Sequence, residues 1–348
     1  MSCEVPATFV SQKISKIRWI PEDYGETKCF LTGSWDDENN AVKVWTFGDP
    51  DENDQIDHPC SLTECLVDGD VTEIKFLDKN RIAVSLSSGT VRILEISAYD
   101  RQTPLREVFA WKRLHNHGSQ NCSCSTLDTL EGDIATGGED GVINILNSRR
   151  GDVTCSVKDA DGCNIYSICF LRHQELITGD IRGLMKTWDL RTSNKEPTTT
   201  FLLSDDELAA TYICNHPTQP HIILVGSESG ALTLWDLRMK SYPASSLKGH
   251  AASITEMQFH PENPQKLFTS SATGEIWSWN MEIINRSTKN ADAQAVMAWT
   301  PLEDKFNKIT TNLMPTLYHS VNTLHCDKGR ILAGTDNEAV YLIKKVPY

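Results

Sequence analysis

The chain has 348 residues, enough to bury a large core, and its 33 basic and 47 acidic side chains give a formal net charge of −14. This charge opposes direct nucleic-acid binding, because Lys and Arg supply the affinity for a phosphate backbone. No apolar run approaches the ~20 residues of a membrane-spanning helix, and the start MSCEVPATFV lacks the regions of a signal peptide, so neither membrane insertion nor secretion is expected.

The first predicted elements are two strands and a hairpin with a long turn. A short strand, TFVSQ, precedes a strand at 13–20, KISKIRWI, and the run TGSWDDENNAVKVW then reaches Trp45. In this run an alternating stretch follows a polar turn and closes in a large apolar residue. The pattern predicts a strand, a turn and a second strand.

Five hairpins with a stricter pattern follow along the chain. Each has a turn that ends in glycine and, five positions later, a large apolar residue that we expect to be buried as an anchor. The pairs are Gly89 with Leu94, Gly141 with Leu146, Gly183 with Trp188, Gly230 with Trp235, and Gly274 with Trp279. A last hairpin, AGTDNEAVYLI, reaches the anchor Ile343 with Glu338 in the position of the glycine.

The turn glycines have a conformational reason. A short hairpin whose twist matches its strands needs a positive φ near its tip, which glycine adopts without steric cost. Asn40 in the first turn and Asn337 in the last keep this conformation accessible there. After the turn, residues alternate as in ALTLWDL, so that one face of the strand buries its large members and the other carries Thr233 or Asp236.

The anchors recur about every 50 residues, slightly more than the ~40 to 45 residues of a four-stranded propeller blade. The sequence therefore predicts an all-β fold, a single seven-bladed β-propeller over residues 1–348. The approximate repeats are 13–66, 70–111, 123–157, 164–203, 208–248, 253–300, and 319–348 together with 7–12.

The last repeat indicates how the ring closes. It contains only three candidate strands, SVNTLHC, RILAGT and AVYLI, whereas the start of the chain has one strand to spare in TFVSQ. Pairing that strand with the last blade would protect both edges from aggregation. We therefore expect the N-terminal strand to complete the seventh blade.

Candidate metal sites are weak. His115, His117, Cys122 and Cys124 in HNHGSQNCSC have ligand types suited to zinc, but their H-x-H and C-x-C spacings are tighter than usual, which favours a polar loop. The run from Asp49 resembles the start of a calcium loop but lacks its glycine and its bidentate Glu, which favours a solvated acidic loop. The eleven cysteines, an odd number without regular spacing, are typical of reduced thiols. No metal or other cofactor is expected.

Catalytic motifs are missing from the sequence. The chain contains no G-x-S-x-G elbow, no glycine-rich phosphate loop and no H-E-x-x-H motif, so we do not expect an enzyme. The long segment from Met281 to His319 instead offers Trp299 and Phe306 as candidate interaction residues among polar neighbours. They either form part of a docking surface or cover the outer strand of the sixth blade.

Several short motifs resemble the WD-repeat family. These are His216-Pro217 and His260-Pro261 after predicted strands, Gly249-His250, and the Trp-Asp pairs that end two strands. In that family the His joins a buried hydrogen-bond network with a turn Asp and the Trp. Here Ala272 and Thr273 stand where the Asp is expected, so the resemblance does not predict a complete network.

The ends of the chain carry a more specific resemblance. FVSQKISKIRW, the lengthened turn in TGSWDDENNAVKVW, and SVNTL followed by AGTDNEAVYLI are similar, in the same order, to a family of WD-repeat nucleoporins. That family belongs to the Y-shaped outer-ring scaffold of the nuclear pore, and its vertebrate members also visit kinetochores in mitosis. The resemblance implies a non-enzymatic scaffold in the nucleus, at the nuclear envelope, whose partners are other outer-ring nucleoporins, including an α-helical solenoid subunit.

Two alternatives remain open. The motifs Trp188-Asp189-Leu190-Arg191 and Trp235-Asp236-Leu237-Arg238 also resemble the paired WD-x-R motifs of substrate receptors for cullin-based ubiquitin ligases, whose exposed Arg reaches an adaptor. The simpler interpretation is that each Arg solvates a strand end or pairs with a neighbouring acid. Recognition of a modified peptide at the channel mouth would instead require a ring of aromatic and acidic residues there.

Overall fold

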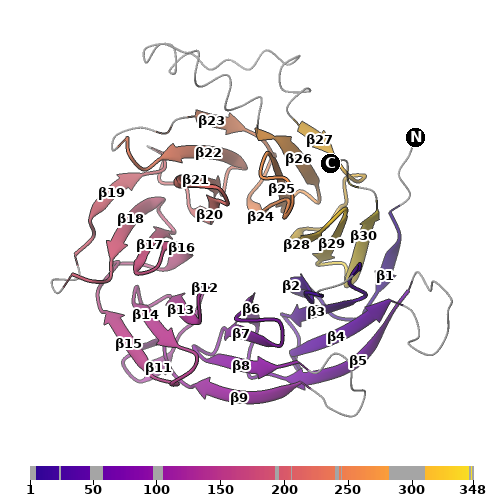
Figure 1. Ribbon diagram of the computed structural model, residues 1–348, viewed down its shortest axis with the longest axis horizontal. Coiled ribbons are helices and arrows are strands. Elements are labelled where there is room, and N and C mark those ends of the chain that lie inside the picture. Colours follow the sequence, from indigo (N-terminus) through magenta and orange to yellow (C-terminus); the bar gives the residue numbers. More distant parts are fainter. Residues whose placement is uncertain are drawn as a thin grey trace.

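The computed structural model describes residues 5–22, 25–47, 58–96, 105–192, 196–204, 206–239, 243, 245–281, 310–344 and 346. Within these ranges, strands form seven four-stranded antiparallel sheets and one two-stranded ribbon. The sheets stand as blades around a central channel, with the first strand of each blade innermost (Figure 1). The predicted seven-bladed all-β propeller is therefore confirmed.

The blades follow the order of the chain, and each runs outward from the channel. The first blade comprises β2 (Ile14–Trp19), β3 (Cys29–Ser34), β4 (Ala41–Phe47) and β5 (Pro59–Leu66). The second comprises β6 (Val71–Phe76), β7 (Arg81–Leu86), β8 (Val91–Glu95) and β9 (Arg106–Trp111). The third comprises β12 (Thr126–Leu130), β13 (Asp133–Gly137), β14 (Ile143–Asn147) and β15 (Val153–Val157). Blades four and five comprise β16 (Ile165–Arg172), β17 (Glu175–Asp180), β18 (Leu184–Asp189), β19 (Thr199–Leu202); and β20 (Ala210–His216), β21 (Gln219–Ser227), β22 (Ala231–Asp236), β23 (Ser245–Lys248).

The last two blades and the ribbon complete the ring. The sixth blade comprises β24 (Ile254–Phe259), β25 (Lys266–Ser271), β26 (Ile276–Asn280), β27 (Thr310–Asn312), and the seventh β28 (Val321–Asp327), β29 (Arg330–Thr335), β30 (Ala339–Lys344), β1 (Ala7–Phe9). The ribbon pairs β10 (Asn116–His117) with β11 (Gln120–Asn121). Strand β27 lies beyond residue 300, where the sequence placed the end of the sixth repeat. Its three polar residues carry no alternating pattern that would identify a strand.

The core is divided among the seven interfaces between blades. Each buried apolar cluster combines two neighbouring blades; in one of them Ile177 and Met185 of the fourth blade pack with Trp235 of the fifth. Because both faces of an inner or middle strand meet a neighbouring blade, polar residues on the alternate face are also enclosed. Thr233 and Asp236, which the alternation placed on the face away from the large residues, are both buried.

The turn glycines hold each blade against the loop that leads into the next. Gly230 has φ 82°, and a Cβ added there would lie only 2.2 Å from the carbonyl oxygen of His250, so both backbone conformation and space require glycine. In the first and last turns, the positive φ falls on Asp36 and Glu338 and not on Asn40 or Asn337. Asn40 instead accepts a hydrogen bond from the Ser34 hydroxyl.

The N-terminal strand closes the ring as predicted. Strand β1 pairs antiparallel with β30, with Ala7 opposite Tyr341 and Phe9 opposite Ala339. Backbone bonds extend the pairing, from Val10 N–H to the Glu338 carbonyl at 2.8 Å and from Leu342 N–H to the Pro6 carbonyl at 3.0 Å. The two ends of the described chain therefore belong to one blade (Figure 1). In the described residues, no helix is long and apolar enough to cross a bilayer.

Deletion of residues 1–12 should lower the melting temperature or cause aggregation, because it leaves the edge of β30 without its partner strand. Thermal unfolding and size-exclusion chromatography measure the two effects. A matched deletion of residues 1–4 keeps β1 and should melt like the full chain. A protein without residues 1–12 that stays monomeric and melts unchanged would contradict the role of β1 in closure.

Candidate functional site

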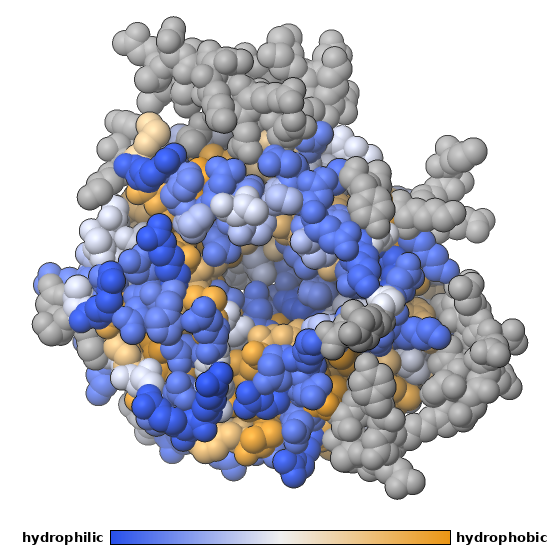
Figure 2. All heavy atoms as spheres, in the orientation of Figure 1, coloured by the Kyte–Doolittle hydropathy of each residue, from blue (hydrophilic) through white to orange (hydrophobic). Residues whose placement is uncertain are grey.

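The central channel encloses a cavity with a volume of about 790 Å³. Its wall is formed by the inner strands of the first six blades and by Asn322 of the seventh. Figure 2 shows it as the hollow at the centre of the ring. Since catalytic and binding groups gather in such cavities, the residues that line it decide what chemistry the propeller can support.

Short polar side chains on the inner strands join each blade to the next. Thr211 donates to the Ile254 carbonyl at 2.6 Å, and Thr255 donates to the Val321 carbonyl at 2.5 Å. Both residues occupy positions where the pairing of the inner strand shifts register, which turns their side chains toward the neighbouring blade. Equivalent bonds run from Thr72 to Cys124, from Ser167 to Ala210 and from Asn322 to Ile14. These hydroxyl and amide groups thus serve as hydrogen-bond donors that join neighbouring blades.

A buried ion network crosses the channel wall between four blades. Arg18 of β2, only 4% exposed, donates through Nη2 to Glu73 of β6 and to Glu256 of β24, each at 2.6 Å. Its Nε donates to the Ile74 carbonyl at 2.9 Å, and its Nη1 donates to the Thr323 hydroxyl of β28 at 3.2 Å. One guanidinium therefore connects the first, second, sixth and seventh blades.

The network keeps its carboxylates ionised. Burial alone would raise the pKa of Glu256, but the charges of Arg18 and Lys16 and hydrogen bonds from Arg18 and Thr323 lower it to about 2. The pKa of Glu73 is also below its usual value, because Lys16 and Arg18 outweigh the cost of burial. At neutral pH both groups are therefore carboxylates in ion pairs, and neither is available as a general acid.

A second group of charges lines the same wall. The Lys16 ammonium lies 3.2 Å from Glu73, and the Lys75 ammonium lies 3.9 Å from Asp128. Both ammonium groups also lie over the Tyr212 ring, at 5.9 and 5.7 Å from its centroid. The cations Lys16, Arg18 and Lys75 thus balance the carboxylates Glu73, Asp128 and Glu256. These ion pairs hold the blades together, and none of these six groups is left without an opposite charge to bind an ionic ligand.

Aromatic groups at the channel are few. Trp35, Tyr166, Tyr212 and Phe259 line it together with Asp70 and Glu139. The chain's own Lys13 ammonium lies 5.5 Å from the Trp35 ring centroid, so this aromatic face already has a cation beside it. Asp70 accepts hydrogen bonds from the Asp36 amide and from Asn40. The arrangement gives no support to a cage for a modified peptide at the channel mouth.

His115 forms a buried network that the sequence did not reveal. It was assigned to a polar loop, but its ring is fully buried and bonds Asp140 at 2.8 Å and the Thr136 hydroxyl at 2.9 Å. Burial alone would lower the pKa of His115, but Cys124 and Asp140 raise it to about 10. No three of His115, His117, Cys122 and Cys124 bring ligand atoms within 4.8 Å of one another, so they do not form a zinc site.

His250 forms the corresponding network in the sixth blade. Its Nε2 bonds the Thr269 hydroxyl at 2.7 Å, and the same hydroxyl accepts the indole N–H of Trp279 at 2.9 Å. Glu275, two residues beyond Thr273, supplies the carboxylate at 3.4 Å, so the network forms although the expected Asp is missing. In both networks the His precedes its carboxylate by 25 residues. That shared separation was the sequence signal that could have identified His115.

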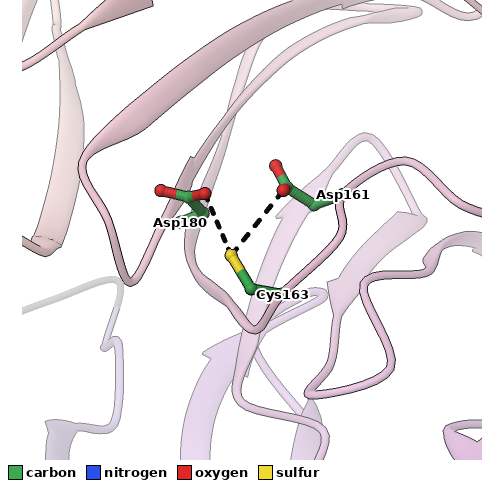
Figure 3. A group of neighbouring side chains, drawn as sticks. All are labelled: Asp161, Cys163 and Asp180. Carbon is green, nitrogen blue, oxygen red and sulfur yellow. Dashed lines mark hydrogen bonds between the residues drawn. The ribbon is translucent and has the colours of Figure 1, made fainter. Parts of the chain in front are cut away.

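Asp161, Cys163 and Asp180 form a compact cluster at the turn of the fourth blade (Figure 3). Burial and the Asp180 carboxylate raise the pKa of the Cys163 thiol to about 11, so it stays protonated and donates to Asp180 at 3.0 Å. Asp161 pairs with the Lys186 ammonium at 2.9 Å. In this structure the three groups are therefore held by contacts with one another and with Lys186.

The structure describes all the anchor and turn-glycine positions that the sequence singled out. The side chains of Trp45, Leu94, Leu146, Trp188, Trp235, Trp279 and Ile343 are all buried. Gly89, Gly141, Gly183, Gly230 and Gly274 all have positive φ. The candidate interaction residues Trp299 and Phe306 lie outside the described residues, as does most of the acidic run from Asp49.

In each of the two Trp-Asp-Leu-Arg motifs, the Arg forms an ion pair with the Asp of the same motif. Arg191 donates to both carboxylate oxygens of Asp189 at 2.8 and 2.7 Å and to Glu175 at 3.2 Å. Arg238 pairs with Asp236 in the same way, with Nε to Oδ1 at 2.8 Å. Hydrogen bonds from Arg191 lower the pKa of Asp189 to about 2. Each Arg therefore has a carboxylate partner in its own motif.

Comparisons with known proteins match both the repeats and the whole chain. A family model described as WD domain, G-beta repeat, matches residues 241–280. Nucleoporin Nup43 of Mus musculus is 31% identical over 379 aligned residues, which cover 99% of each chain, and Nucleoporin Nup43 of Homo sapiens is 31% identical over 377, which cover 98% of each. Nuclear pore complex protein nup43 of Dictyostelium discoideum is 27% identical over 148 residues, covering 42% of this chain and 35% of that relative.

Proposed function

Since this chain belongs to the Nup43 family of nucleoporins, we propose that it acts as a non-enzymatic scaffold subunit of the outer ring of the nuclear pore complex. The observation that carries this proposal is the similarity over nearly the full length of the mouse and human relatives. As a nucleoporin it is located at the nuclear envelope, and its partners there are other nucleoporins. A mitotic role at kinetochores, implied by the family resemblance, belongs to the same proposal.

The channel supports a scaffold more than a catalyst. Its carboxylates Glu73, Asp128 and Glu256 are paired with Arg18, Lys16 and Lys75, and several of its hydroxyl groups donate to neighbouring blades. Catalysis requires a site with free and correctly placed groups, and these residues are already engaged in ion pairs and hydrogen bonds. Their contribution is rigidity, which a scaffold subunit needs to hold its partners at fixed positions.

We propose that the main partner of this chain in the outer ring is an α-helical solenoid nucleoporin. The innermost strand of each described blade faces the channel, so the surfaces offered to a large partner are the two rims and the outer strands. Such interfaces usually draw their affinity from a few buried aromatic or Arg side chains. On sequence alone, Trp299 and Phe306 are candidates, and exchanging both for Ser would test them in the assay below.

The proposal is tested by affinity purification of a tagged chain from cells, together with imaging. Outer-ring nucleoporins should be recovered in stoichiometric amounts, and the tag should mark the nuclear envelope in interphase. In mitotic cells the same tag reports on kinetochores. Recovery of the tagged chain without nucleoporins would overturn the proposal.

The ubiquitin-ligase alternative is tested by the same purification. Because Arg191 and Arg238 already pair with the acids of their own motifs, changing both to Ala should leave the recovery of nucleoporins unchanged. A stoichiometric ligase adaptor that is recovered with the unaltered chain and lost with this double variant would favour the alternative.

A further inference from the structure

The outer strand of the second blade and the turn that leads into the outer strand of the third lie together beside exposed apolar side chains. Phe109 on β9 is 39% exposed and Val153 on β15 is 45% exposed. The Phe109 ring packs edge-on against Trp111 with centroids 4.7 Å apart. Figure 2 shows apolar residues at the edge of the ring where β8 and β9 lie in Figure 1.

The turn between β14 and β15 fixes the two blades together at this place. The Trp111 indole N–H donates to the Gly151 carbonyl at 3.1 Å. A Cβ added to Gly151 would lie 3.1 Å from the Phe109 ring, so glycine allows the turn to approach β9 closely. The turn therefore presents its neighbours, Arg149 and Arg150, beside the exposed ring.

The same surface is basic, although the chain as a whole carries a net charge of −14. Lys112, which follows Trp111, and Arg149 and Arg150 are exposed. Arg150 lies 3.4 Å from Asp152. In the part of the chain that the structure describes, no carboxylate pairs with Lys112 or Arg149. Along β9, by contrast, Arg106 pairs with Glu95 on the neighbouring strand.

Resting on the scaffold function proposed above, we propose that the junction surface, formed by Phe109, Lys112, Arg149, Arg150 and Val153, binds an acidic amphipathic segment of a neighbouring nucleoporin. Apolar side chains of that segment cover Phe109 and Val153, and its carboxylates pair with the three cations. The apolar contact supplies most of the affinity, because exposed ion pairs contribute little, and the charges set orientation and association rate.

A protein segment fits this surface better than a nucleic acid does. A phosphate backbone would meet the three cations but would leave Phe109 and Val153 without apolar partners. It would also be repelled by the surrounding acidic surface of a chain with net charge −14. An acidic peptide with apolar side chains satisfies both features in a small area.

The first test measures binding to the reconstituted outer-ring nucleoporin assembly that lacks this subunit. Changing Arg149 and Arg150 to Glu should weaken binding about tenfold or more and make it less sensitive to salt, and Phe109→Ser should weaken it to a similar extent. The matched control changes Arg191 and Arg238 to Glu, whose side chains are 60% and 67% exposed compared with 65% for Arg150. All variants should melt within a few degrees of the unaltered protein, and the control should bind normally.

The two proposals fail in different ways in this assay. If the unaltered chain does not bind the assembly, the scaffold function is wrong. If it binds and the Arg149 and Arg150 double variant, correctly folded, binds equally well, the scaffold function stands and the junction surface is not the docking site.

A second test identifies the chemistry of the occupant. Carbodiimide joins a Lys ammonium to a carboxylate in direct contact, so Lys112 should be cross-linked to an Asp or Glu of another nucleoporin in the assembled complex. A cross-link from Lys112 to a second copy of this chain would indicate self-association and overturn the proposal. Binding of a labelled single-stranded RNA that is lost on changing Arg149 and Arg150 to Glu, with assembly unaffected, would also overturn it.

Discussion

Replacing Arg18 with Met should lower the free energy of unfolding by about 3–5 kcal/mol, the range for removing one partner of a buried ion pair. The guanidinium joins Glu73 and Glu256 at 2.6 Å each, and both carboxylates are buried. Without Arg18 the two carboxylates stay buried with only part of their compensation. Because they belong to different blades, their repulsion would also act against ring closure. Chemical denaturation at neutral pH measures the loss.

Two further variants show whether charge is the cause. Glu256→Gln in the Arg18→Met background should recover part of the lost stability, since it removes an uncompensated buried charge. Arg191→Met breaks an exposed pair and should change stability by less than about 1 kcal/mol. An Arg18→Met protein that is as stable as this control would contradict the role of the network.

The pH dependence of this effect follows from the pKa of Glu256. In the folded protein it is lowered from 4.5 to about 2, so the ion pair contributes fully above pH 4.5, and its contribution is lost as the pH falls toward 2. The difference in stability between the unaltered protein and Arg18→Met should therefore be largest near neutral pH and should shrink as the pH falls toward 2, beginning above pH 4.5, because burial without Arg18 raises the pKa of Glu256 in the variant. Denaturation curves over this range measure it, and a difference that is constant with pH would contradict the assignment.

Changing Trp188 to Ala should cost about 3–5 kcal/mol, the range for truncating a large aromatic side chain in a core. The indole is buried at the interface of the third and fourth blades with Ile165 and Leu176, and its N–H donates to the Thr178 hydroxyl at 2.9 Å. Truncation removes the indole ring and leaves a cavity between the sheets of the third and fourth blades. The corresponding change at Trp235 should cost a similar amount, because that ring is buried between the fourth and fifth blades.

Smaller changes at this site separate packing from hydrogen bonding. Trp188→Phe keeps most of the apolar contact but loses the bond to Thr178, so it should cost about 1–2 kcal/mol beyond the difference in size. Tyr318 is fully exposed, and Tyr318→Ala should change stability by no more than about 0.5 kcal/mol. Unfolding midpoints that do not distinguish Trp188→Ala from this control would show that the anchor is not part of the core.

Local constraints allowed the sequence alone to determine the class and number of units. Each turn glycine and the anchor five residues later belong to one hairpin, whose geometry depends on nearby residues only. Five such hairpins, two weaker ones at the ends, a three-stranded last repeat and a spare strand at the start were sufficient to predict a closed seven-bladed ring. The prediction failed where local pattern was weak. The short polar strand β27 was missed, and the positive φ of two turns fell on Asp36 and Glu338 instead of Asn40 and Asn337.

The tertiary structure alone decided which polar residues are buried and what they contact. His115 belonged by sequence to a polar loop, and only the packing of the second blade against the third encloses it with Asp140 and Thr136. Arg18 meets Glu256 although 238 residues separate them, and no local pattern on β2 or β24 indicates that contact. The physical reason is that a hairpin is specified by neighbours in the chain, whereas a buried charge is specified by whichever strands the closed ring places around it. The repeats therefore determined the ring, and ring closure determined the ion network and the junction surface.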